Sequence, residues 1–231
     1  MPEKKEILIT KHNALVEASY KLTLNEQRLI LFCISKIDPR KPLAKDNSFT
    51  ISASEFSETF GIDEKNAYKE LEKASKTLSE RWIKTYKHGE KEKFRWIFGM
   101  IYHKNEGKLT LGFSPWIEPY LTKLYKQFTS YKLAQVSKLK SIYSIRLFEF
   151  INQFKKTGKL SIDIEKFKER LELKSGYSRF YNLKKRVIEP AVKELSEKSN
   201  ISIDWKPIKS GRNTKQLEFT FYEKKLRKEE N

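Results

Sequence analysis

The sequence has one cysteine, Cys33, among its 231 residues, so it forms no internal disulfide framework and no cysteine-based zinc finger. Glycine and proline are scarce at 8 and 7 residues, which excludes collagen-like and linker-like chains. The sequence contains no run of 18 or more apolar residues, the length needed to cross a membrane. No apolar stretch of signal-peptide length follows the charged first residues. We therefore expect a cytoplasmic protein with no membrane partner.

Histidine is equally rare, and His12, His88 and His103 are spaced in no metal-ligand pattern. The sequence has neither the histidine pair of a rolling-circle nicking enzyme nor a Gly-x-x-x-x-Gly-Lys-Ser/Thr phosphate loop. We therefore expect no catalytic residues, no metal and no cofactor. A DNA-nicking enzyme is the weaker alternative, because eleven tyrosines leave a tyrosine nucleophile open.

Positive charge is what the sequence has in excess. Lysine and arginine number 48 against 30 acidic residues, a net charge of +18 and a pI of about 9.7. Residues 1–120 hold 21 basic and 17 acidic side chains, whereas residues 121–231 hold 27 and 13. A general lysine bias should affect both halves, so the excess in the second half favours a nucleic-acid-binding surface there. Aromatic residues, at 13%, are numerous enough to fill a core.

The order of predicted elements occurs twice. Hydrophobic spacing predicts helices over 25–37, 54–60 and 65–81, and strands over 48–52, 82–86, 94–102 and 108–113. Thr23 or Asn25 is expected to cap the first helix, and Gly61 to close the second. In the second half, helices are predicted over 141–154, 165–173 and 178–199, and strands over 159–164, 201–205 and 216–222.

Three helices followed by a β-hairpin are the plan of a winged helix. We therefore expect an α+β protein of two winged-helix domains in pseudo-symmetric tandem, residues 1–125 and 126–231. The stretch 124–136 between them fits either a packed helix or a joint.

The strongest candidate site lies at the start of the second long helix, where a winged helix reads DNA. Residues 174–186 hold five basic side chains and no acid. Arg179, Asn182 and Arg186 are spaced for one helix face, with Ser178, Tyr181 and Lys185 on an adjacent one. Arginine pairs with guanine, asparagine with adenine, and lysine, tyrosine or a helix N-terminus with phosphate. The predicted DNA-binding residues are Lys174, Ser175, Tyr177, Ser178, Arg179, Tyr181, Asn182, Lys184, Lys185 and Arg186.

Two basic hairpin tips, 87–93 and 209–215, are predicted as the wings of the two domains. They add the candidates Lys87, Lys91, Lys209, Arg212 and Lys215. The first-half counterpart of the reading helix mixes charges between Asp63 and Glu70, which fits a phosphate contact or a solvated face equally well. The span 121–160, nine basic residues against Glu149, fits duplex contact or solubilising surface.

Three motifs occur in order along the chain. Residues 13–30 contain Asn-x-Leu-x-x-Ala and then Leu-Thr-x-x-Glu-x-Arg-Leu. Residues 139–149 read Leu-Lys-Ser-Ile-Tyr-Ser-Ile-Arg-Leu-Phe-Glu, and residues 177–186 contain Tyr-Ser-Arg followed by Lys-Lys-Arg. Together they resemble the iteron-binding plasmid replication initiators, the Rep proteins of theta-replicating plasmids. The resemblance implies that Arg179 and Lys185 are the best candidates for base contacts. Relatives often carry arginine at the position of Lys185, and an arginine can make two parallel hydrogen bonds to guanine, which a lysine cannot.

The resemblance implies binding to double-stranded DNA, both to repeats at a plasmid origin and to an inverted repeat in the operator. It implies monomers that help to melt A/T-rich DNA, in equilibrium with homodimers that are joined through the first domain and repress their own gene. The host initiator and the replicative helicase are the implied partners, in a bacterial cytoplasm and without catalysis. A winged-helix transcription regulator with no replication role is the alternative.

Overall fold

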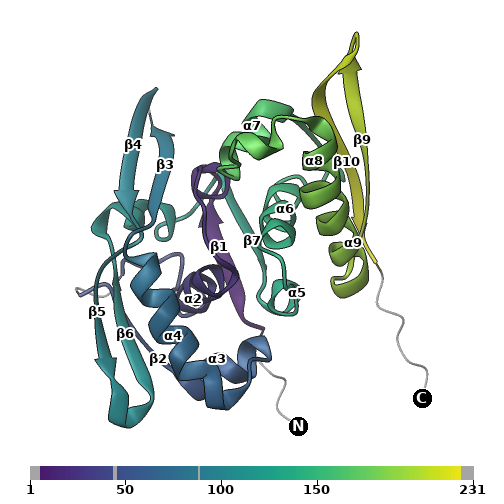
Figure 1. Ribbon diagram of the computed structural model, residues 1–231. Coiled ribbons are helices and arrows are strands. Elements are labelled where there is room, and N and C mark those ends of the chain that lie inside the picture. Colours follow the sequence, from purple (N-terminus) through teal and green to yellow (C-terminus); the bar gives the residue numbers. More distant parts are fainter. Residues whose placement is uncertain (1–5, 44–45, 88, 225–231) are drawn as a thin grey trace, which may run out of the picture. The chain divides into compact units, whose positions relative to one another are not determined.

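A computed structural model describes residues 6–43, 46–87 and 89–224, with the side chain of Lys87 outside the described part (Figure 1). The chain divides into two compact units, Met1–Lys138 and Leu139–Asn231. No helix in the described ranges is long and apolar enough to span a bilayer. Cys33 is a free thiol buried in the first unit.

The first unit is built on the helices α2 (Leu24–Ile34), α3 (Ala53–Phe60) and α4 (Glu64–Leu78). Thr23 caps α2 as predicted, since its hydroxyl accepts from the Glu26 N–H at 3.3 Å while the Glu26 carboxylate accepts from the Thr23 N–H at 2.6 Å. These reciprocal bonds satisfy donors that the first turn of a helix leaves open. Gly61 ends α3 with a φ of 61°, which confirms the predicted left-handed close.

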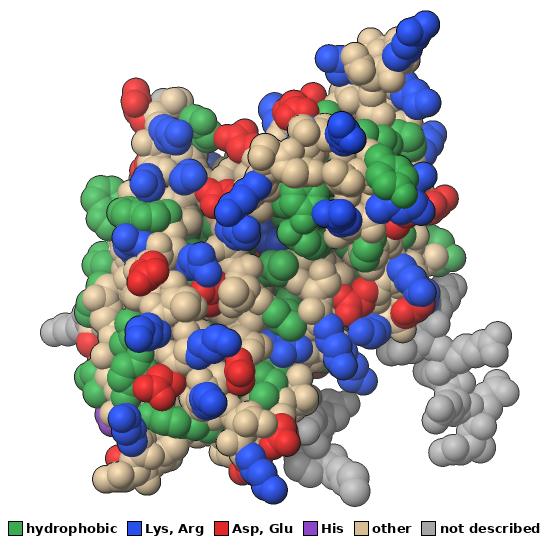
Figure 2. Space-filling view, viewed as in Figure 1, with side chains coloured by type: hydrophobic (Ala, Val, Ile, Leu, Met, Phe, Trp, Pro, Cys, Tyr) green, Lys and Arg blue, Asp and Glu red, His purple; other side chains and the backbone are tan. Residues whose placement is uncertain are grey.

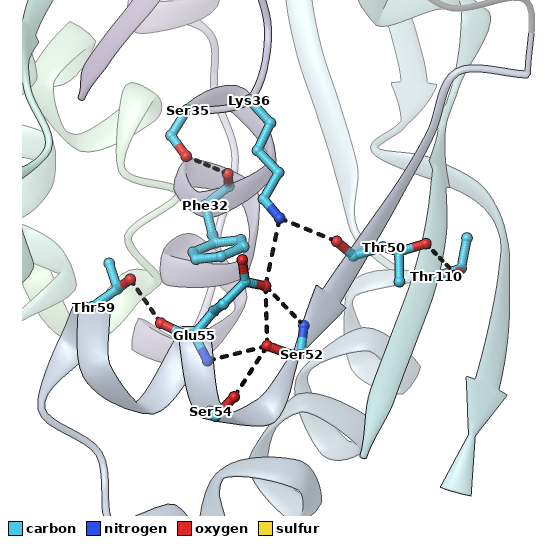
Figure 3. A network of polar contacts seen from close by, with 9 residues as sticks. All are labelled: Phe32, Ser35, Lys36, Thr50, Ser52, Ser54, Glu55, Thr59 and Thr110. Carbon is cyan, nitrogen blue, oxygen red and sulfur yellow. Dashed lines mark hydrogen bonds and ion pairs between the residues drawn. The ribbon is translucent and has the colours of Figure 1, made fainter. Parts of the chain in front are cut away.

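Polar contacts fix the corner between α2, β2 (Ser48–Ser52) and α3 (Figure 3). The Lys36 ammonium donates to the Thr50 carbonyl at 3.2 Å and lies 3.6 Å from the Glu55 carboxylate. Glu55 also accepts from the Ser52 N–H at 3.3 Å, completing the cap of α3. The end of one helix is thereby tied to the start of the next across an exposed surface.

The strands of the first unit form three separate sheets. The strand β2 pairs with β6 (Lys108–Phe113), which pairs with β5 (Ile97–His103), giving the order β2-β6-β5. A two-stranded ribbon is formed by β3 (Trp82–Lys87) and β4 (Glu90–Arg95). The predicted single strand over 94–102 is therefore wrong, because the chain turns at the fully buried Trp96 and enters a different sheet.

The third sheet of the first unit places the domain boundary later in the sequence than predicted. The segment 124–136, unassigned from the sequence, contains β7 (Phe128–Lys132) and the start of α5 (Ala134–Ser137). Antiparallel to β7 runs β1 (Leu8–His12), which leads into α1 (Asn13–Glu17). These two strands satisfy each other's backbone groups, so β7 belongs to the first unit. The division falls after Lys138 rather than after residue 125.

The second unit repeats the plan of the first. Its elements are α6 (Ile142–Asn152), β8 (Lys159–Asp163), α7 (Ile164–Arg170), α8 (Phe180–Leu183), α9 (Glu189–Lys198), β9 (Ile201–Ser210) and β10 (Asn213–Glu223). The sheet order β8-β10-β9 matches β2-β6-β5, and the core contains the buried rings of Phe148 and Phe167 from the helices and of Phe219 from β10. The predicted α+β fold of two winged-helix domains in tandem is confirmed.

The matching sheets also identify the wings. The wing of the second unit is the hairpin β9–β10, as predicted. Its counterpart in the first unit is the hairpin β5–β6. The strand β6 pairs with β2, which follows α2, just as β10 pairs with β8, which follows α6. The prediction that 87–93 is the first wing is wrong, because Lys87 lies in β3 and residues 90–93 lie in β4, the two strands of a ribbon inserted between α4 and β5.

Candidate nucleic-acid interface

Residues 174–186, the predicted DNA-binding stretch and hereafter the reading segment, begin with a turn rather than with the helix that was predicted from residue 178. Ser175–Tyr177 form a 3-10 turn, and Arg179 is the extended N-cap residue of α8, with a φ of −75° and a ψ of 124°. Most predicted contacts in this segment are exposed: Lys174, Ser175, Ser178, Arg179, Tyr181, Lys185 and Arg186. Tyr177, Asn182 and Lys184 are half-buried.

The helix that follows is continuous but irregular. Between α8 and α9, Lys184–Ile188 form a π turn in which the Glu189 N–H donates to the Lys184 carbonyl five residues back. Pro190 follows, and its ring nitrogen has no hydrogen for the regular ladder. Because Arg179 precedes the helix and Arg186 lies within the π turn, their sequence spacing does not place them on one α-helical face as predicted.

Two side chains hold the turn against the helix. The Asn182 amide donates to the Gly176 carbonyl at 2.9 Å. The Tyr177 hydroxyl is hydrogen-bonded to Tyr143 on α6, and burial together with this bond raises the pKa of Tyr143 to about 12. The amide predicted to pair with adenine is thus engaged within the protein, where it fixes the backbone that precedes Arg179.

An acid outside the predicted DNA-binding residues lies among the cations. Glu189 is 3.0 Å from the Lys185 ammonium and 3.5 Å from that of Lys184. The hydrogen bond to Glu189 raises the pKa of Lys185, and the same bond lowers the pKa of Glu189. The four-residue spacing of Lys185 and Glu189 predicts an ion pair on a helix, but Glu189 lies beyond the acid-free stretch 174–186.

A second acid fixes the reading helix to the first helix of its domain. The carboxylate of Glu194 on α9 accepts the N–H of Lys140 at 2.9 Å and that of Ser141 at 3.1 Å, at the N-terminus of α6. Burial opposes its ionisation, but hydrogen bonds, the strongest from Lys198, leave the pKa of Glu194 below its ordinary value. The helix that continues from the reading segment is therefore held to α6 by a charged contact.

The wing of the second unit carries its three predicted cations at the tip. Lys209 lies opposite Thr214, Arg212 lies in the turn, and Lys215 occupies a bulge before Gln216. All three are exposed, and Figure 2 shows Lys and Arg side chains gathered at this tip. A bulge adds twist to a hairpin and redirects its side chains. The reading segment and the wing thus present exposed positive charge from two elements of one domain.

The first unit offers a different distribution. Lys91 is exposed on the ribbon, whereas the side chain of Lys87 lies outside the described residues. The counterpart of the reading helix, α4, is capped by Asp63, which accepts from the Lys65 N–H at 2.9 Å. Nowhere in the described ranges do three or more His, Cys, Asp or Glu side chains gather in a group that could hold a metal.

The fold defines the chain as a tandem winged-helix protein. The family model for "Initiator Replication protein, WH1" matches residues 8–152, and that for "Initiator Rep protein, WH2" matches residues 163–221. Between them they cover most of both units. The chain belongs to the family of initiator replication proteins.

Known relatives extend this result. A replication initiation protein of Escherichia coli is 33% identical over 208 residues, which cover 86% of this chain and 65% of that relative's length. The PI protein of Escherichia coli is 26% identical and covers 96% of this chain and 84% of its own. The crystal structure of Pi initiator protein in complex with iteron DNA matches with a TM-score of 0.82 at 25% identity, over 96% of this chain and all of that one.

Proposed function

We propose that the protein is a plasmid replication initiator that binds repeated double-stranded DNA sites at an origin and helps to open the adjacent DNA. The observation that carries the proposal is the paired exposure of the reading segment and the wing in the second unit. The likeness to the Pi initiator, whose structure holds iteron DNA, supports the same role. The protein acts by binding, without catalysis or a cofactor, in the bacterial cytoplasm.

The reading segment divides its contacts between bases and phosphates. Arg179 is the first candidate for a base contact, because it is exposed where a reading helix starts, and an arginine fork matches guanine. Lys185 and Arg186 come next along the helix. Lys174, Ser175 and Ser178 approach phosphate before the helix begins, and Lys209, Arg212 and Lys215 approach it from the wing.

A homodimer in equilibrium with the monomer is the second part of the proposal. The strand β5 lies at the edge of its sheet, and residues 97–102 carry no charged side chain. Phe98 and Ile101 are 66% and 59% exposed. An uncharged edge strand is a template for pairing with another chain. We propose that this dimer binds an operator inverted repeat and represses the gene of the protein itself.

The host initiator and the replicative helicase complete the proposed set of partners, because DNA opened at the origin must be handed to the replication machinery. Pull-down of each purified host protein by the chain bound to its duplex site tests this part. Absence of both from the bound fraction would contradict it.

Selection from a random duplex library tests the central proposal. We expect a discrete consensus, with an affinity that Arg179→Ala lowers by about 1–3 kcal/mol while relaxing one base position. Lys193→Ala, which removes an exposed charge from α9, is the matched control and should leave the consensus unchanged. Equal binding to every duplex would refute a sequence reader.

The alternatives give different results in the same material. A regulator without a replication role would bind one promoter site, and the gene with its upstream repeats would not sustain a plasmid in cells. A nicking enzyme would relax supercoiled plasmid in the presence of a divalent metal.

For the dimer, Ile101→Lys should shift the sedimentation equilibrium toward the monomer.

A further inference from the structure

One face of the ribbon β3–β4 is unlike the rest of the first unit. The cross-strand pairs Trp82–Arg95, Lys84–Lys93 and Tyr86–Lys91 place these six side chains on one side. The intervening Ile83, Thr85 and Phe94 are buried, so the six face outward. This ribbon face holds two aromatic side chains and four cations and no acid. Figure 2 shows Lys and Arg side chains over the ribbon and hydrophobic ones beside its base.

The cations and the aromatic rings are unevenly distributed between the two strands. On β4 the outward row is Lys91, Lys93 and Arg95, all cations, with about 6.6 Å between neighbours. The neighbouring row on β3, about 4.8 Å away, consists of Trp82, Lys84 and Tyr86, so a cation lies between its two aromatic rings. Cations alongside exposed rings are the arrangement that binds a nucleic-acid strand by its phosphates and its bases at once.

The ribbon face continues into a hollow at its base. This cavity, of about 500 Å³, is lined by Trp82, Lys93, Arg95, Phe98 and Trp116 among others, and none of its lining residues is acidic. The Arg95 guanidinium carbon lies 3.8 Å from the centre of the Trp82 ring, and the Lys93 ammonium 4.3 Å. These contacts order both cations where the hollow opens.

Two groups at the hollow lack a partner that a ligand would supply. Nη1 of Arg95 is buried and has no hydrogen-bond acceptor within the described part of the chain. A buried donor without an acceptor costs free energy, and a phosphate or base oxygen would accept its hydrogen bond. The Trp116 side chain is 67% exposed, so its ring is open to a stacking partner.

We infer that the ribbon face and its hollow bind single-stranded nucleic acid, with phosphates along Lys91, Lys93 and Arg95 and bases stacked on Tyr86 and Trp116. In a duplex the bases are already stacked and paired, so exposed rings gain nothing from them, whereas unpaired bases are free to stack. The inference rests on the proposed function, since an opened origin supplies the unpaired strand. It assigns that strand to the first unit, away from the residues that read the duplex.

Fluorescence anisotropy of the full chain tests the inference with two probes, a labelled 20-nucleotide oligo-dT and the selected consensus duplex. Tyr86→Ala and Trp116→Ala should each lower oligo-dT affinity by about 5- to 150-fold and leave duplex affinity unchanged. Tyr125→Ala is the matched control, because it removes a 77% exposed tyrosine from the same unit. Phe98 is left intact because it also lies at the edge proposed for the dimer.

Three results would overturn the inference. An equal loss for both probes would make the ribbon face part of the duplex contact. Unchanged oligo-dT binding with a shifted monomer–dimer equilibrium would make it an interface between copies. Absence of any oligo-dT binding while the consensus duplex still binds would reject the single-strand site and leave the proposed function standing. Loss of the duplex consensus alone would instead reject the proposed function.

Discussion

Removal of the three wing cations should change the salt dependence of DNA binding in a calculable way. Lys209, Arg212 and Lys215 are all exposed at the tip of β9–β10. Each phosphate contact releases condensed counterions, so the slope of log K against log salt changes by about 0.9 per contact. The triple alanine variant should therefore have a slope shallower by about 2.7, if all three bind phosphate.

The same relation gives the loss of affinity. With the electrostatic contribution taken as zero at 1 M salt, three contacts are worth about 150-fold at 0.15 M, or about 3 kcal/mol. At 0.05 M salt the loss rises to about 3000-fold. The variant should thus be most impaired in dilute salt and should approach the unaltered protein as salt increases.

Anisotropy titrations of the selected duplex at four salt concentrations measure both quantities. The single variants at the three positions apportion the change, and Lys41→Ala, a 77% exposed lysine paired with Asp38 in the first unit, controls for net charge. A slope that stays the same in the triple variant would refute the reasoning, because it would mean that the wing contacts no phosphate. An unchanged slope together with an affinity lowered by the same factor at every salt concentration would also exclude phosphate contacts from the wing, and that loss would be attributed to damage of the fold.

Three further predictions concern the support of the site. Asn182→Ala should speed amide exchange in the turn 175–177 and leave the selected consensus unchanged, whereas a new base preference would show that Asn182 reads DNA. The pKa of Glu194 is lowered in the folded state, so the stability that this carboxylate contributes is complete above pH 4.5 and is lost as the pH falls through the lower folded pKa. The thermal unfolding temperature of Glu194→Gln should therefore depend less on pH between 6 and 3 than that of the unaltered protein, and an equal dependence would contradict this role. Glu26 is fully buried, lies 3.0 Å from the partly exposed Arg81 and accepts the Thr23 N–H, so Glu26→Ala should lower the unfolding free energy in urea by about 2–3 kcal/mol, and a loss below 1 kcal/mol would contradict the pairing.

Most elements of the fold were predictable from periodicity and capping. The helices α2, α3, α4 and α6 lie within a few residues of their predicted ranges, because their apolar faces and caps are local signals. The strands β1 and β7 were missed, since each is short and is stabilised by the other from more than a hundred residues away. The same dependence hid the true boundary after Lys138.

The site was predictable in composition but not in geometry. Basic residues without acids located the reading segment, and they remain its exposed surface. The hydrogen bond from Asn182 to Gly176 could not be predicted, because it depends on a 3-10 turn that has no periodic signal. The ribbon face was also missed, because residues 82–102 were divided into strands without knowledge of their partners. Only the register of β3 against β4 brings its six side chains together.

The π turn at Lys184–Ile188 gives the reading helix a site at which its length can change without loss of the core. Because the Glu189 N–H donates to the Lys184 carbonyl five residues back, deletion of one residue between them would leave the same two groups to close a regular α-helical turn. The residues before and after the π turn would then keep their orientation, so the buried contacts of α9 and the exposed position of Arg179 would both be preserved. The fold would therefore tolerate the loss of a single codon at this position, whereas the same loss within a regular part of the helix would rotate the residues before it by about 100°.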